Sequence, residues 1–208
     1  MENVLVIATA LLVLTPAIVL HEFAHGWVAY RLGDSTAYLA GRLTLNPLKH
    51  VDPVGTIIIP GTLFLLYYFK LLPHLMLFGW AKPIPVNFRA LRHPKQDMMC
   101  VGMAGPLVNV LLAFFLSRFW NLELSAAWRT LLEISIYLNL GLAVFNMIPI
   151  PPLDGSRLVM GLLPRELAIP YMKLERFGLL IVVVCLQLGL LRFVYPIVDI
   201  LANALGVH

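Results

Sequence analysis

Long apolar runs separated by short basic segments dominate this chain. The first run begins at residue 3 and continues to residue 30, which predicts one helix over residues 3–30. Further apolar runs predict helices over residues 98–120, 131–149 and 177–195. A helix needs about 20 mainly apolar residues to cross a bilayer, and these runs have that length or more. The pattern therefore predicts an all-α polytopic membrane protein.

Two intervening segments depart from this pattern. Residues 31–53 contain a short run that ends at Asn46-Pro47, and they predict a short β-hairpin or loop near the membrane surface. Residues 54–80 are apolar but are interrupted by Pro60-Gly61, which favours a re-entrant helical hairpin, with a simple crossing as the alternative. Residues 1–208 are therefore predicted to form one integral-membrane domain of five to six transmembrane or re-entrant helices.

The composition agrees with a membrane location. Apolar residues make up 60% of the 208 residues and charged residues 12%, whereas soluble domains carry about 25% charged residues. These values exclude a disordered chain and argue against a water-soluble enzyme, because too few polar residues remain to cover a soluble surface. The net charge of +4 comes from basic residues that flank apolar runs, without the basic patch of a nucleic-acid-binding protein. The predicted partner of this surface is the lipid bilayer.

The basic residues also predict an orientation. They are concentrated after the first predicted helix, before the helix over residues 98–120, and before the helix over residues 177–195. Cytoplasmic loops carry an excess of Lys and Arg, so these three segments are placed in the cytoplasm. The chain is then a multi-pass protein of the cell membrane with its N-terminus outside.

A polar cluster, His21-Glu22-Phe23-Ala24-His25, ends the uncharged part of the first helix. Ionisable groups within a membrane helix are costly, so they indicate a function. Positions i and i+4 share one helix face, so both imidazoles can bind one metal ion, and Glu22 is placed to take a proton from the attacking water. This spacing predicts one Zn2+ ion bound by His21 and His25, with Glu22 as the catalytic base.

A catalytic zinc site usually has three protein ligands, so a further ligand is expected elsewhere in the chain. Asp154 is the strongest candidate, because it ends a charge-free stretch in which Pro149, Pro151 and Pro152 forbid a regular helix. The helix over residues 131–149 is thus expected to continue as an extended segment to residue 155. The alternative is that Asp154 only forms a turn with the glycine that follows it. Weaker candidates for the third ligand are Glu133, Asp199, His50, His74 and His93.

Two asparagines and one short segment are candidates for substrate binding. Asn109 and Asn146 lie within predicted helices, where they either bridge helices or hold the substrate or the oxyanion of a tetrahedral intermediate. Arg42, Leu43 and Thr44 lie in the predicted hairpin, whose free edge would pair with an unwound substrate by strand addition. The alternative for these three residues is an ordinary interfacial hairpin.

Together these motifs resemble the site-2 protease family of intramembrane zinc metalloproteases. The resemblance rests on HEFAH in the first helix, AGPLVN in the helix over residues 98–120, and NMIPIPPLDG at the end of the next helix. The segment GWAKPIPVN, residues 79–87, is similar to that of compact members without PDZ or CBS domains. The resemblance implies zinc ligation by His21, His25 and Asp154, with Glu22 as the base, and it implicates the asparagine of the last motif in substrate handling.

The resemblance further implies an endopeptidase that cleaves single-span membrane proteins within or near their transmembrane segments, as in regulated intramembrane proteolysis. Its active site would open toward the cytoplasm. The residues also leave two alternatives open, a membrane metal-ion transporter and an inactive relative that binds membrane proteins. A transporter would spread polar residues along a path, whereas these collect at one depth. A Glu22→Gln variant that keeps zinc but loses cleavage would favour the protease.

Overall fold

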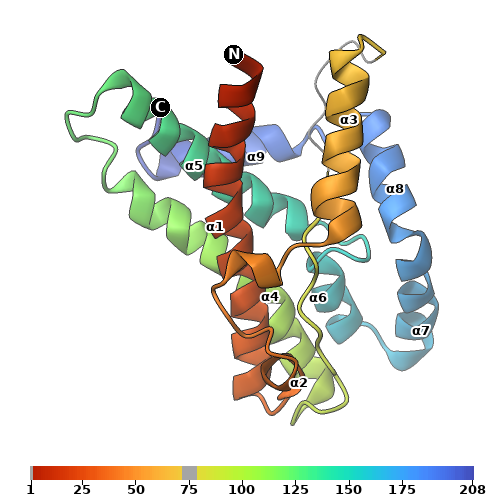
Figure 1. Ribbon diagram of the computed structural model, residues 1–208. Helices are drawn as coiled ribbons and strands as arrows, with labels where there is room; N and C mark the ends of the chain where they lie inside the picture. The colour runs from red at the N-terminus through yellow and green to blue at the C-terminus, as the bar shows by residue number, and fades with distance from the viewer. Residues whose placement is uncertain (1, 72–78) are drawn as a thin grey trace.

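Three long helices form the centre of the molecule. They are α1 (Glu2–Arg31), α4 (Pro94–Ser117) and α5 (Ala126–Asn146), and α4 packs against both of the others (Figure 1). The structure is a computed structural model that describes residues 2–71 and 79–208. Within these residues it contains helices and turns but no strand, which confirms the predicted all-α class.

Shorter helices surround this centre. In chain order they are α2 (Thr36–Leu39), the 3₁₀ turn η1 (Pro47–Lys49), the π-helical turn η2 (Pro53–Ile58), α3 (Ile59–Tyr68), α6 (Gly155–Leu162), α7 (Arg165–Lys173), α8 (Glu175–Gln187) and α9 (Val194–Ala204). α6 packs against α4, and α9 packs against α5. α7 and α8 form the right-hand edge in Figure 1, away from the loop that joins α4 to α5.

Local sequence sets the ends of the helices that carry the candidate site. α4 begins at Pro94, whose fixed φ suits a first helical position. Asp97, in the first turn of α4, accepts a hydrogen bond from the His93 N–H at 2.7 Å, so an acidic group meets the positive end of the helix dipole. α5 ends at Asn146, and the three prolines within residues 149–152 prevent the helix from continuing, because proline has no N–H to donate.

A buried apolar cluster joins α4, α5 and α9. Its members are Ala113, Trp120, Ile136, Leu140, Val198, Ala202 and Val207. Many other large apolar side chains are exposed on the outer faces of the helices, among them Leu65, Phe114, Leu180 and Ile200. A soluble monomer rarely exposes so much apolar surface, so this outer surface fits a bilayer.

Two helices of the described chain are long and apolar enough to cross a membrane. They are Leu12–Arg31, within α1, and Pro94–Ser117, which is α4. α5 has 21 residues, but Arg129 and Glu133 lower its hydropathy. The apolar helices Pro53–Tyr68 and Val194–Ala204 are shorter than a span. The predicted count of five to six spans is therefore not supported by the helices.

The helix predicted over residues 177–195 is two helices. α8 ends at Gln187 and α9 begins at Val194. Gly189 has a φ of +68°, in the left-handed region that glycine adopts at the end of a helix. The re-entrant hairpin predicted over residues 54–80 lies partly outside the described residues, because the structure describes η2 and α3 but not residues 72–78.

The β-hairpin predicted within residues 31–53 is wrong, because the chain there forms α2, η1 and turns. The Gly41 N–H donates to the Tyr38 carbonyl, and the Arg42 N–H donates to the Ala37 carbonyl, both at 2.9 Å. Gly41 has a φ of +63°, which ends α2. Backbone groups that a strand would offer to a partner strand are therefore used to close a helix.

Candidate metal centre

One face of α1 carries both histidines of the HEFAH motif. His21 and His25 are four residues apart, so their rings lie one turn from each other, with ring centroids separated by 4.7 Å. Both residues are buried, with 6% and 8% of their surface exposed. Their Nε2 atoms are 3.0 Å apart. The two imidazoles therefore direct one nitrogen each toward the same point.

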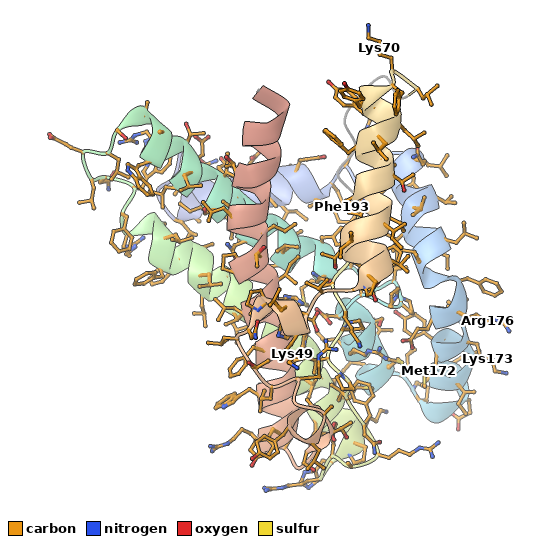
Figure 2. All side chains as sticks on the ribbon, viewed as in Figure 1. Lys49, Lys70, Met172, Lys173, Arg176 and Phe193 are labelled. Carbon is orange, nitrogen blue, oxygen red and sulfur yellow. The ribbon has the colours of Figure 1, made fainter. Side chains whose placement is uncertain are left out.

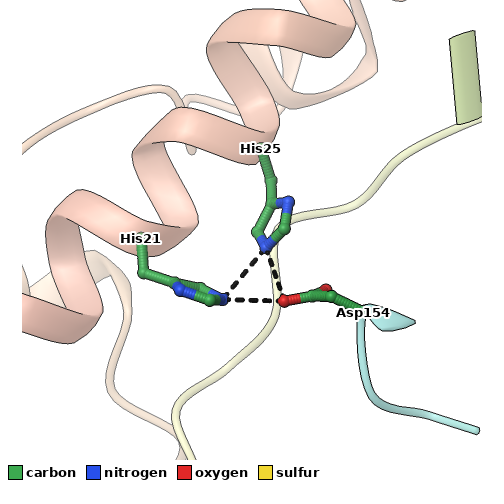
Figure 3. Close-up of side chains that lie close together, drawn as sticks. All are labelled: His21, His25 and Asp154. Carbon is green, nitrogen blue, oxygen red and sulfur yellow. Dashed lines mark hydrogen bonds and ion pairs between the residues drawn. The ribbon is translucent and has the colours of Figure 1, made fainter. Parts of the chain in front are cut away.

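Asp154 brings a carboxylate to this point from the other half of the chain. It lies directly before α6, after the proline-rich segment that follows α5. Its Oδ2 atom is 3.0 Å from His21 Nε2 and 3.2 Å from His25 Nε2 (Figure 3). Among the residues that the structure describes, these three are the one group of histidine, cysteine and acidic side chains able to hold a metal ion.

Oxygen atoms behind the two rings fix their orientation. His25 Nδ1 lies 2.7 Å from the Val101 carbonyl oxygen. His21 Nδ1 lies 2.5 Å from Asn109 Oδ1, while the Asn109 Nδ2 group donates to Asn139 Oδ1 at 2.8 Å. Acceptors at both Nδ1 atoms place the ring protons there, which leaves each Nε2 atom with a lone pair for a ligand.

The three facing atoms suit a positive charge among them. With the ring protons on Nδ1, the Nε2 lone pairs of His21 and His25 and the carboxylate of Asp154 lie 3.0 to 3.2 Å apart, and a cation between them offsets their mutual repulsion. Two imidazole nitrogens and one carboxylate oxygen are also the ligand set of many catalytic zinc sites. The residues present therefore fit a zinc ion.

Glycines on α4 make room for this centre. A Cβ atom built on Gly105 would lie 2.5 Å from His21 Nε2, closer than a real side chain is found. A Cβ atom on Gly102 would lie 3.1 Å from the backbone oxygen of Asp154. Because Gly102 and Gly105 carry no side chain, α4 can lie close both to the histidines of α1 and to Asp154.

Glu22 is held by a segment far away in the sequence. Its Oε2 atom accepts a hydrogen bond from the Ile84 N–H at 2.8 Å. Ile84 lies within residues 79–87, which have no helical structure. The contact was not expected from the sequence. Pro83 and Pro85 could have indicated it, because prolines carry no N–H and Ile84 is the one backbone N–H donor of the Pro83-Ile84-Pro85 tripeptide.

Asn109 lies against the metal centre and bonds to residues of two other helices. It is fully buried, and its Nδ2 group donates both to Asn139 and to the Ala17 carbonyl, the latter at 3.3 Å. Its two amide hydrogens thus have protein acceptors, and its oxygen faces His21. Asn109 therefore orients His21 and joins α4 to α1 and α5, as expected for an amide that bridges helices, and its role toward substrate or the oxyanion stays a prediction.

Asn146 is the last residue of α5, and its Nδ2 group donates to the Leu142 carbonyl of the same helix at 3.0 Å. The structure does not bring the weaker candidate ligands to the two histidines. Those in the described part of the chain are Glu133, Asp199, His50 and His93, whereas His74 lies outside it.

The residues of the predicted strand-pairing segment turn toward the protein. Arg42 is buried, and its Nη2 group donates to the Lys82 carbonyl at 2.7 Å. Leu43 is half-buried, and the Thr44 carbonyl accepts a hydrogen bond from His50 Nε2 at 2.9 Å. No strand is present there within the described residues, so the hairpin edge expected for strand addition is not found, and substrate binding by these three residues stays a prediction.

Comparison with known proteins finds related proteases. The model of peptidase family M50 matches residues 121–189. The "Putative zinc metalloprotease YwhC" of Bacillus subtilis is 41% identical over 79% of this chain and 74% of that protein. The "Putative zinc metalloprotease Rip2" of Mycolicibacterium smegmatis is 30% identical over 80% of this chain and 62% of that protein. The "Stage IV sporulation protein FB" of Bacillus subtilis is 27% identical over 86% of this chain and 59% of that protein. No solved structure matches.

The similarity is not confined to one motif. The family match extends from before α5 to the end of α8 and includes Asp154. The match to YwhC extends over 175 residues and most of both chains. The chain therefore belongs to peptidase family M50, the site-2 protease family, and is a zinc metalloprotease.

Proposed function

We propose that this protease is an intramembrane endopeptidase that cleaves single-span membrane proteins within or near their transmembrane segments, as in regulated intramembrane proteolysis. The observation that carries the proposal is that Asp154 meets His21 and His25 on α1, a helix that is long and apolar enough to cross a membrane. A hydrolytic centre on such a helix is within reach of peptide bonds in the bilayer. The proposal includes one zinc ion bound by these three residues.

Each polar residue of the centre has a separate task in this proposal. When bound, zinc supplies a Lewis acid that lowers the pKa of the attacking water to about 7 and polarises the scissile carbonyl. Glu22 takes a proton from that water and later donates it to the leaving amine. Asn146 holds the substrate backbone or the developing oxyanion. The substrate helix must unwind locally, because its carbonyls are otherwise occupied by helical hydrogen bonds.

The basic side chains support an orientation with the N-terminus outside. Lys70 lies at the same end of the molecule as the N-terminus, whereas Lys173 and Arg176 lie nearer the opposite end (Figures 1 and 2). The more basic segments then face the cytoplasm, as the positive-inside rule requires. The protein is thus a multi-pass protein of the cell membrane whose site opens toward the cytoplasm near the proline-rich segment before Asp154.

The test measures zinc content and cleavage on the same preparation. Purified protein in detergent or lipid is incubated with single-span substrates. We expect the wild type to bind zinc and cleave, Glu22→Gln to bind zinc without cleaving, and Asp154→Asn to lose zinc. Exposed acids of the same types provide matched controls, so Glu123→Gln and Asp199→Asn should retain both properties. Cleavage by Glu22→Gln at the wild-type rate, or full zinc in Asp154→Asn, would contradict these assignments. Zinc-loaded wild type that cleaves no membrane substrate would favour the inactive relative.

A further inference from the structure

An extended segment beside α1 makes contact with the proposed catalytic base. We call residues 80–87 the strap. Its first half is tied down by the Lys82 N–H, which donates to the His50 carbonyl at 2.9 Å. Its second half is tied down by the Asn87 N–H, which donates to Asp34 Oδ2 at 2.6 Å. The strap is therefore fixed on both sides of its midpoint.

The strap lies against a different face of α1 from the metal centre. Glu22 and Gly26 are four residues apart and share a helix face, one position along from the face of the two histidines. Ile84, in the middle of the strap, is buried against this face. A Cβ atom on Gly26 would lie 3.0 Å from Ile84 Cδ1, so the glycine allows the strap to approach closely.

The sequence of the strap leaves one backbone hydrogen-bond donor beside Glu22, the proposed base. Pro83 and Pro85 carry no N–H, so Ile84 is the one residue of this tripeptide able to donate from the backbone. That N–H donates to Glu22 Oε2 at 2.8 Å. A backbone donor on one carboxylate oxygen fixes the rotamer of the side chain and leaves the other oxygen for proton transfer.

Arg42 holds the strap just before this contact. The residue is 8% exposed, and its Nη2 group donates to the carbonyls of Lys82 and Pro83, at 2.7 and 3.4 Å. A buried guanidinium that bonds two successive carbonyls leaves the next residue, Ile84, little freedom to move. Arg42 thus acts on Glu22 through the backbone of the strap.

We propose that the strap positions Glu22 for proton transfer, with Ile84 and Arg42 as positioning residues. This inference rests on the proposed role of Glu22 as the base. It assigns a task to the GWAKPIPVN segment, which the metal site does not use. The strap hydrogen bonds described above join it to Glu22, Arg42, His50 and Asp34, none of which is a proposed zinc ligand, so its loss should slow the chemical step without releasing zinc.

The test removes the Ile84 N–H from the zinc-loaded full chain. We expect Ile84→Pro to lower kcat about 10- to 100-fold, part of what general base catalysis contributes, with KM and bound zinc unchanged. Ile84→Ala keeps the N–H, so its loss of kcat should be clearly smaller. Val86→Pro is the matched control, because it also removes a strap N–H, one with no hydrogen bond in the described structure, and it should leave kcat unchanged. Equal losses in Ile84→Pro and Ile84→Ala would overturn the inference.

Three further variants keep the inference testable if Ile84→Pro does not fold. Replacing the amide at position 84 by an ester removes the N–H and retains the isoleucine side chain, and it should lower kcat in the same way. Arg42→Ala should lower kcat with zinc retained, and Arg42→Lys should restore part of it. If Glu22→Gln is inactive but the ester variant is fully active, this inference fails and the proposed function stands. If Glu22→Gln is fully active, the proposed role of Glu22 has failed.

Discussion

The hydrogen bond between His21 Nδ1 and Asn109 gives a direct test of how the metal centre is built. Leucine has the same branched arrangement of side-chain heavy atoms as asparagine but no acceptor, so Asn109→Leu removes the bond at 2.5 Å and leaves the Ala17 carbonyl and Asn139 Oδ1 without their donor. Removing the partner of a metal-bound histidine typically weakens metal binding about 10- to 100-fold. That factor corresponds to about 1.4 to 2.8 kcal/mol of zinc binding free energy.

The assay is competition for zinc between the purified protein and a chelator of known affinity. Asn203→Leu changes an exposed asparagine on α9 and serves as the control, with wild-type affinity expected. Asn109→Asp retains an acceptor for the Nδ1 proton, so its affinity should lie between those of the wild type and Asn109→Leu. If Asn109→Leu binds zinc as tightly as the wild type, the orientation of His21 does not depend on this amide and the reasoning is refuted.

Three more outcomes follow from the same structure. Gly105→Ala should abolish tight zinc binding, because its Cβ would lie 2.5 Å from His21 Nε2, whereas Gly141→Ala meets nothing within 4 Å and should retain zinc in the same chelator assay. Asp97→Asn should lower the free energy of unfolding by about 1 kcal/mol, since it weakens the hydrogen bond that Asp97 accepts from the His93 N–H at the start of α4. Denaturation in detergent measures this, and an unchanged midpoint would contradict a stabilising role of that bond. Chelator treatment should abolish cleavage and added zinc should restore it, and cleavage that persists in metal-free protein would exclude a zinc-dependent reaction.

The parts of the site that were predictable from the sequence depend on local geometry. His21 and His25 share a helix face because of their spacing alone, and that spacing survives any packing of α1. The prolines before Asp154 stop a helix wherever they occur, so an extended approach to that residue was also predictable. The all-α class followed in the same way from the length of the apolar runs.

The parts that were not predictable depend on contacts between distant segments. Asn109 meets His21 across 88 residues, and Ile84 meets Glu22 across 62. No pattern within α4 reveals which side chain faces an amide, so the sequence left Asn109 open between bridging helices and binding substrate. The strand predicted around Arg42 failed for the same reason, since the guanidinium finds its acceptors in the strap and the backbone closes α2. The break at Gly189 was missed because the apolar run continues through it.

The distance along the chain between the metal ligands has a consequence for biosynthesis. His21, Glu22 and His25 leave the ribosome early, whereas Asp154 follows 133 residues after His21. Until Asp154 has been made, the growing chain carries two ligands and the base but lacks the carboxylate that completes the set. A polypeptide that has not reached Asp154 therefore has no assembled hydrolytic centre to which neighbouring membrane proteins are exposed.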